Sequence, residues 1–154
     1  MGNSLSENLV VEADPSPDDI RRLEDSIYDF NVQVTGISDG KLFGLFLRDA
    51  DGVAIGGAHG WTWARTCYVC NLFVPAHMRD QGHGTRLMHA VEAEARSRGC
   101  EDILLRTLDF QAPEFYLRLG FKIIGRVPDC PHGHHAITMA KYLTSQGTVS
   151  ERSR

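Results

Sequence analysis

Residues 79–85 form a glycine-containing loop that organises the second half of the chain, and they read Arg79-Asp80-Gln81-Gly82-His83-Gly84-Thr85. An apolar stretch precedes the loop at 67–74 and is closed by Pro75, and an amphipathic stretch follows at 85–98. Two glycines allow a tight turn and a close approach of the backbone to a ligand. The helix that begins there offers unpaired N–H groups and the positive end of its dipole. The stretch therefore predicts a strand, an anion-binding loop and a helix.

The segments after this helix complete a βαβ unit. Gly99 is a suitable residue to end the helix. The apolar run 103–105 is typical of a strand buried on both faces, and a right-handed crossover should place it parallel to the strand before the loop. A short helix is expected with Pro113 at its start and Gly120 just past its end. Two closing strands are expected at 122–127 and 136–143.

The first half of the chain predicts a helix followed by an antiparallel meander. We expect a short first strand at 9–12 and a helix from Asp18 to near Asn31. Strands at 42–47 and 53–63 are joined by the turn sequence Asp49-Ala50-Asp51-Gly52. The fold class is thus α/β (α+β), with a mixed, mostly antiparallel sheet flanked by helices.

Composition places the chain among ordinary globular proteins. It has 154 residues, 42% of them hydrophobic and 23% charged, which suits one domain. We expect that domain to span 1–143, with a disordered polar tail at 144–154. The net charge of -4 argues against a nucleic-acid partner, and no apolar run approaches the roughly 18 residues of a membrane span.

Two features bear on where the protein resides. Four cysteines do not form a disulfide scaffold, and no apolar signal segment follows the N-terminus, so we expect a cytoplasmic protein. Residues 1–6 fit the pattern for myristoylation of Gly2. Because no polybasic stretch supplies a second membrane signal, a frayed polar terminus is the plainer interpretation.

The glycine loop departs from two known phosphate-binding patterns and matches a third. A P-loop needs lysine after its last glycine, where this chain has Thr85, and a dinucleotide fingerprint needs a third glycine. The pattern Arg/Gln-x-x-Gly-x-Gly/Ala is matched by Arg79, Gly82 and Gly84. With this loop, the strand before it and the segment 115–121 (FYLRLGF, similar to FY-x-x-LGF), the chain resembles the GNAT superfamily of acyl-CoA N-acyltransferases between about 68 and 121.

This resemblance implies a fold in which two parallel strands splay apart and acetyl-CoA lies between them. It implies that the backbone of the first splayed strand pairs with pantetheine, and that the glycine loop holds the pyrophosphate. Gln111 is expected beside the acyl group, and no metal is expected. An ordinary solvated side chain is the alternative for Arg79. The cofactor-binding residues expected are Leu72, Phe73, Val74, Arg79, Asp80, Gln81, Gly82, His83, Gly84, Thr85 and Gln111.

Transfer of an acetyl group to an amine needs an oxyanion donor, a base and a group that stabilises the leaving thiolate. The resemblance implies a backbone N–H near Phe73 or Val74 as the oxyanion donor, and Tyr116 as the catalytic residue facing the thiolate. A phenol has a pKa of about 10 and a thiol about 8.5, so full proton transfer is uphill by about 2 kcal/mol. Tyr116 should therefore act largely as a hydrogen-bond donor unless its pKa is lowered; a core tyrosine is the alternative.

The base is not evident from the sequence. Many family members carry a carboxylate on the strand before the glycine loop, but the segment 68–71 reads Tyr-Val-Cys-Asn. His59, His77, Asp109 or a chain of waters remain as candidates.

Three other features have competing interpretations. Cys67 and Cys70 form a C-x-x-C pair, but positions i and i+3 of a strand point to opposite faces, so zinc is not expected. Trp61 and Trp63 share a strand face, where they either line the acceptor site or pack under the first helix. Residues 12–29 hold seven acids against two arginines, a local balance of 2 - 7 = -5 that either attracts a cationic amine or is a solvated helix face.

The function expected is acetyl transfer from acetyl-CoA to a primary amine of a small molecule or peptide, by direct attack in a ternary complex. The alternatives are a non-catalytic acyl-CoA-binding sensor or subunit, and a nucleotide-phosphate binder. Homodimerisation stays open.

Overall fold

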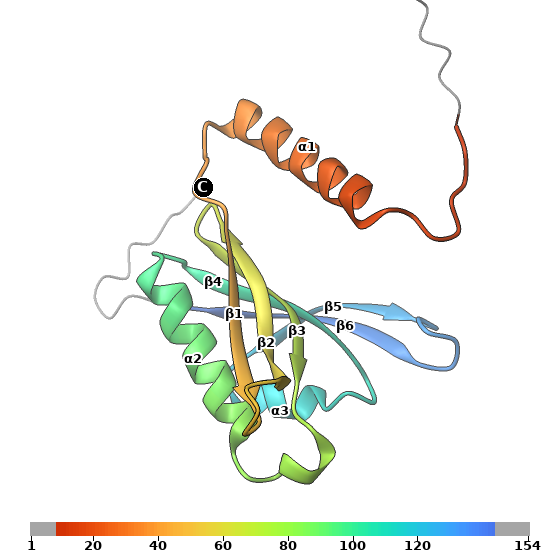
Figure 1. The fold of residues 1–154 in the computed structure, drawn as a ribbon. Helices are drawn as coiled ribbons and strands as arrows, with labels where there is room; N and C mark the ends of the chain where they lie inside the picture. Colours follow the sequence, from red (N-terminus) through yellow and green to blue (C-terminus); the bar gives the residue numbers. More distant parts are fainter. Residues whose placement is uncertain (1–8, 144–154) are drawn as a thin grey trace, which may run out of the picture. The chain divides into compact units, whose positions relative to one another are not determined.

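The computed structural model describes residues 9–143, which fall into two units that meet between Ile37 and Ser38. The first unit holds helix α1 (Pro17–Thr35), and the second holds the sheet with its helices (Figure 1). Among the described residues, no helix has the length and apolar character needed to cross a membrane.

Helix α1 has clear start and stop signals. The Ser16 hydroxyl accepts a hydrogen bond from the Asp18 N–H at 3.3 Å, and Pro17 occupies the first helical position. Gly36 ends the helix in the left-handed conformation with φ 72°, so the helix runs four residues beyond the predicted end at Asn31. The apolar spacing that predicted the helix is confirmed as helical.

The predicted first strand at 9–12 is wrong, since these residues adopt no strand conformation. A strand needs a neighbour to accept and donate its backbone hydrogen bonds. Edge strand β1 (Lys41–Arg48) pairs with β2 (Ala54–Trp63), and the described structure gives residues 9–12 no pairing partner. The sequence of residues 9–12 does not show whether a neighbouring strand is available for pairing.

The second unit is built on one six-stranded sheet with the order β1-β2-β3-β4-β6-β5. The strands β3 (Thr66–Phe73) and β4 (Asp102–Leu108) are parallel, and every other neighbouring pair is antiparallel. Strands β5 (Lys122–Pro128) and β6 (His135–Tyr142) form the closing hairpin. The predicted mixed, mostly antiparallel sheet with one parallel pair is therefore confirmed.

Helix α2 (His83–Ser97) supplies the crossover between the two parallel strands. Its buried residues lie on one face, where Val91 and Ala95 are fully buried with Ile103 of β4 and Met139 of β6 in a common core. Arg98, just past the helix, donates hydrogen bonds to the carbonyl oxygens of Lys41 and Leu42. These bonds tie the end of the helix to the outer strand of the sheet.

Strand β4 differs in one respect from the prediction of a strand buried on both faces. Ile103 and Leu105 are buried, as is Thr107, but Leu104 between them is half-buried. The burial alternates along the strand because α2 covers one face of the sheet in this half of the unit (Figure 1). An unbroken run of three apolar residues does not show whether a strand is buried on one face or on both.

Candidate functional site

The two parallel strands separate part-way along their length. Their pairing runs from Thr66 beside Asp102 to Val69 beside Leu105, and stops there. Beyond that point β3 continues at 70–73 against β2, while β4 continues at 106–108 against β6. The result is an opening between β3 and β4, which we call the strand opening.

A β-bulge stands where the strands separate. His59 pairs with Asn71 and Gly60 pairs with Val69, so Cys70 is an extra residue in β3. Bulges bend a strand and increase its local twist, which accounts for the divergence of β3 from β4. Gly60 is required here, because a Cβ atom at this position would lie 1.9 Å from the carbonyl oxygen of Tyr68.

The glycine loop follows β3 through Pro75 and the short helix η1 (Ala76–Met78). Two of its residues have positive φ angles, Asp80 at 59° and Gly82 at 80°. Its side chains brace it from within, since Arg79 Nε donates to the carbonyl oxygen of Val74 at 3.1 Å and Gln81 Nε2 donates to that of His77 at 2.9 Å. In this structure Arg79 and Gln81 therefore hold the shape of the loop.

The loop and the start of α2 present donors suited to a phosphate. The structure gives the backbone N–H groups of residues 82–85 no acceptor within the described chain, as expected at a helix N-terminus. The Nδ1 atom of His83 is buried and also lacks a partner there. A pyrophosphate, which offers only acceptors, fits this set of donors. Asp80 is the one acidic side chain of the loop, and it is exposed.

Tyr116 lies on helix α3 (Pro113–Arg118), next to the glycine loop. A Cβ atom on Gly84 would come within 3.2 Å of the ring of Phe115, which shows how closely the two helices approach. The Tyr116 ring is buried and makes edge contacts with Phe115 and Phe121, at centroid distances of 5.0 and 5.8 Å. Its hydroxyl makes no hydrogen bond within the described chain. The hydroxyl oxygen is not fully buried, so it stays accessible to a partner.

Burial raises the pKa of Tyr116 above its ordinary value of 10.0. Full proton transfer from Tyr116 at little cost would require a lowered pKa, and the pKa is raised instead. A neutral phenol with an uncommitted hydroxyl remains suited to donate a hydrogen bond to a developing thiolate.

Gln111 and Asp109 lie in the turn that connects β4 with α3. Gln111 accepts a hydrogen bond from the Leu108 N–H through Oε1 at 3.2 Å, which closes the turn. The Asp109 carboxylate is held by two histidines, His134 and His135, at the start of β6. Neither histidine was among the base candidates predicted from the sequence.

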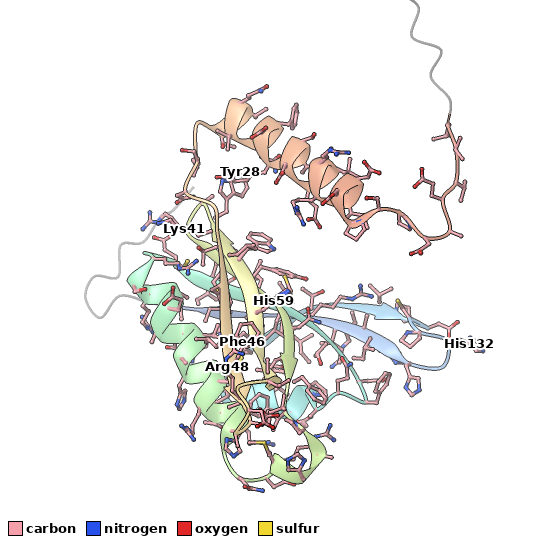
Figure 2. All side chains as sticks on the ribbon, viewed as in Figure 1. Tyr28, Lys41, Phe46, Arg48, His59 and His132 are labelled. Carbon is pink, nitrogen blue, oxygen red and sulfur yellow. The ribbon has the colours of Figure 1, made fainter. Side chains whose placement is uncertain are left out.

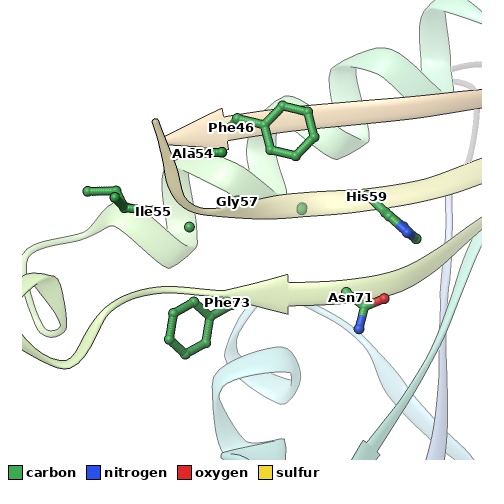
Figure 3. Close-up of a pocket in the computed structure, with 9 residues that line it drawn as sticks. Phe46, Ala54, Ile55, Gly57, His59, Asn71 and Phe73 are labelled. Carbon is green, nitrogen blue, oxygen red and sulfur yellow. The ribbon is translucent and has the colours of Figure 1, made fainter. Parts of the chain in front are cut away.

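The remaining base candidates lie apart from each other. His77 is exposed in η1. His59 lines a cavity of about 310 Å³ with Asn71 of β3, and the aromatic rings of Phe46 and Phe73 stand beside it (Figure 3). Asn71 and Phe73 line this cavity and belong to the part of β3 that borders the strand opening, so a molecule bound there would be next to the predicted pantetheine strand.

Trp61 lies on the exposed side of β2, and Trp63 is half-buried at the end of the strand. Trp61 stacks on Tyr68 of β3, with ring centroids 5.4 Å apart and an angle of 15° between the planes. Trp61 is partly exposed. Both interpretations of the tryptophan pair, acceptor wall or packing surface, remain predictions.

The C-x-x-C pair is arranged as the strand geometry predicts. Cys67 is fully buried and burial raises its pKa to about 12, whereas Cys70 is exposed. The described residues contain no cluster of three or more histidine, cysteine or acidic side chains placed to hold a metal ion.

The structure thus places helix α3, which carries Tyr116, beside the glycine loop that follows β3. A family model described as the Acetyltransferase (GNAT) family matches residues 7–121. The chain belongs to this family. It is an acetyltransferase with the GNAT fold, and the resemblance stated from the sequence is confirmed.

Named relatives agree with this assignment. Acetyltransferase Atu2258 of Agrobacterium fabrum (strain C58 / ATCC 33970) is 32% identical over 121 residues, which are 79% of this chain and 88% of that protein. The blasticidin-S acetyltransferase of Streptomyces morookaense is 38% identical over 107 residues, which are 67% of this chain and 76% of that protein.

Solved structures share the architecture. A crystal structure from Agrobacterium tumefaciens has a TM-score of 0.80 at 30% identity, covering 89% of this chain and 100% of that chain. Two more distant structures with the same fold, 20% and 23% identical, were determined with coenzyme A and with acetyl coenzyme A.

Proposed function

We propose that this acetyltransferase moves the acetyl group of acetyl-CoA to a primary amine of a small molecule, by direct attack in a ternary complex. The observation that carries the proposal is the strand opening, flanked by a helix N-terminus with uncommitted N–H groups and by the uncommitted hydroxyl of Tyr116. The opening suits pantetheine, the N–H groups suit a pyrophosphate, and the hydroxyl suits the leaving thiolate.

In this proposal acetyl-CoA is the acyl-donating substrate, and its thioester supplies the activated carbonyl. The N–H groups of residues 82–85 bind the pyrophosphate, with the positive end of α2 behind them. The backbone of residues 72–74, at the end of β3, pairs with the amides of pantetheine as an added strand would. Arg79, Asp80 and Gln81 shape the loop, and Gln111 fixes the turn on the β4 side of the opening.

Tyr116 stabilises the departing thiolate through a hydrogen bond from its neutral hydroxyl. Burial keeps the phenol protonated, which favours donation over ionisation. A backbone N–H near Phe73 or Val74 is the proposed oxyanion donor. Because Cys70 is not part of a family motif, no covalent acyl-cysteine intermediate is included.

A small molecule is the proposed class of acceptor. One relative is named for blasticidin S, a small molecule. The cavity of about 310 Å³ beside the segment 71–73 is of the size of a small-molecule site. A peptide amine is the broader alternative for the acceptor.

A non-catalytic acyl-CoA-binding module is the second candidate. It is favoured by one observation, the absence of a carboxylate at 68–71 on the strand before the glycine loop. This candidate predicts binding of acetyl-CoA without consumption.

Thiol release separates the two functions. The full chain is incubated with acetyl-CoA and a panel containing blasticidin S, simple primary amines and a short peptide, and free CoA is followed with a thiol reagent while the amine product is identified by mass spectrometry. Amine-dependent CoA release with an acetylated product supports the enzyme. Saturable acetyl-CoA binding with no release over the whole panel would favour the binding module.

A further inference from the structure

A carboxylate–histidine cluster stands at the end of β4, outside the residues assigned so far. The Nδ1 atom of His134 lies 3.0 Å from Oδ1 of Asp109, and the Nδ1 atom of His135 lies 3.2 Å from Oδ2. The backbone N–H of His135 also donates to Oδ2 at 3.0 Å, and the Asp109 N–H donates to the His135 carbonyl oxygen at 3.0 Å. Both oxygens of the carboxylate are thus engaged by the same hairpin.

The carboxylate is a poor proton acceptor in this arrangement. Desolvation alone would raise the pKa of Asp109, but the hydrogen bonds from His135 and His134 outweigh it and hold the pKa below its ordinary value of 3.8. Asp109 is therefore ionised at neutral pH and acts on its neighbours as a fixed negative charge. This makes it an orienting group for the imidazoles.

The cluster lies on the β4 side of the strand opening. Asp109 directly follows the strand, whose residues 106–108 form one wall of the opening. The ring of His134 packs edge-on against Phe110, with centroids 4.7 Å apart, and Gln111 closes the same turn. The His134 ring therefore has two contacts, one to Asp109 and one to Phe110. These contacts hold it beside the turn with Gln111, which is expected to line the acyl group.

This geometry determines which imidazole nitrogen can accept a proton. When Nδ1 carries hydrogen and donates it to the carboxylate, Nε2 has a lone pair. His134 and His135 have side chains that are 48% and 51% exposed, so solvent can remove a proton that they take up. An oriented imidazole with access to water has the properties of a general base.

We propose that His134 is the catalytic base of the transfer and that Asp109 is its positioning residue, with His135 supporting the carboxylate. The proposal rests on the acetyltransferase function above. His134 Nε2 takes one proton from the acceptor ammonium, and the freed lone pair of the nitrogen attacks the thioester carbon. The C–S bond then breaks with its electron pair on sulfur. The nitrogen loses its second proton to solvent, the thiolate takes one proton from solvent while Tyr116 holds it by a hydrogen bond, and His134 returns its proton to solvent. One proton is therefore released per turnover.

Other titratable groups face this cluster. Besides Asp109 and His135, the hairpin contributes Asp129, whose charge interacts with His135, and Asp129 also holds His132. The His132 side chain is 97% exposed at the tip of the hairpin (Figure 2). The pair His132–Asp129 therefore repeats the histidine–carboxylate contact away from the strand opening, and it provides a matched control.

The test compares His134→Gln with His132→Gln in the full chain, with saturating acetyl-CoA and blasticidin S or the amine of the panel with the highest rate. We expect His134→Gln to lower kcat/KM about 100-fold or more at neutral pH and to flatten the acidic limb of the pH–rate profile. We expect His132→Gln to keep the shape of that profile. Free imidazole should restore part of the activity of His134→Ala, and acetyl-CoA affinity should be unchanged in all three variants.

Asp109→Asn provides the readout for the positioning role. It removes the carboxylate that holds both imidazoles, so kcat/KM should fall while acetyl-CoA affinity is kept, and Asp109→Glu should recover part of the loss. Unchanged kcat/KM in His134→Gln would overturn the proposal, and so would equal losses in His132→Gln.

A measurement without an acceptor keeps this test separate from that of the function. Side-chain 1H–15N NMR of the full chain should show neutral His134 and His135 with hydrogen on Nδ1, and Asp109→Asn should alter this preference. If no amine is turned over by the unchanged protein, the proposed function fails. Hydrogen on Nε2 of neutral His134 would by itself refute the base assignment.

Discussion

Gly82 offers the sharpest test of the phosphate-binding loop. It adopts φ +80°, and a Cβ atom built on it would meet nothing within 4 Å. Replacement by alanine is therefore free of steric collision in the unbound protein, and its cost lies in the backbone conformation. An L-residue in the left-handed region costs about 1–2 kcal/mol. If the unbound loop of the variant relaxes out of this conformation and acetyl-CoA binding restores it, the cost is measured as a roughly 5- to 30-fold increase in Kd.

The assay is calorimetric titration of Gly82→Ala with acetyl-CoA. Gly99 is the matched control, since it has φ +73°, nothing within 4 Å, and lies at the other end of the same helix. Gly99→Ala has the same conformational cost away from the glycine loop, so it should lower thermal stability while keeping the affinity of the unchanged protein. If both variants bind acetyl-CoA equally well, the loop conformation is not needed for binding and the pyrophosphate assignment is wrong.

Three further predictions concern single side chains. Tyr116→Phe should lower kcat about 10- to 1000-fold with acetyl-CoA affinity kept, as for loss of one transition-state donor; equal losses in both would show a structural tyrosine. At pH 8.5 a thiol reagent should modify Cys70 well before Cys67, because burial raises the pKa of Cys67 to about 12 and leaves almost no thiolate; rapid modification of both in the folded protein would contradict this. For Glu92, desolvation alone would raise the pKa, but the hydrogen bond from Lys141 helps to hold it below 4.5. Glu92→Gln should therefore cost about 1 kcal/mol of unfolding free energy at pH 7, and this difference should shrink as the pH falls from 4.5 through the lowered pKa of Glu92.

Much of the fold was predictable because its signals are local. The turn at 49–52 specified a hairpin, and the Asp49 carboxylate indeed accepts from the N–H groups of Asp51 and Val53 at 3.0 and 2.8 Å. The parallel β3–β4 pair followed from the strand–helix–strand order, since a crossover helix leaves few other arrangements.

What the sequence did not predict depends on partners distant in the chain. The segment 9–12 has the composition of a strand but lacks a pairing partner in the described structure. The bulge at Cys70 arises from the register of β2 against β3. The residues around Cys70 alone do not predict this register. The Asp109–His134 contact joins residues 25 positions apart, so the histidine-rich run gave no indication of its carboxylate.

The central claim is that acetyl-CoA binds in the strand opening and on the glycine loop. Hydrogen exchange measured by mass spectrometry on the full chain, with and without saturating acetyl-CoA, tests it most directly. The account predicts slower exchange in the segments 70–74 and 80–85, where the backbone N–H groups would gain acceptors, and little change in the β1–β2 turn at 49–52. Protection confined to other segments, or none at these two under saturating acetyl-CoA, would contradict it.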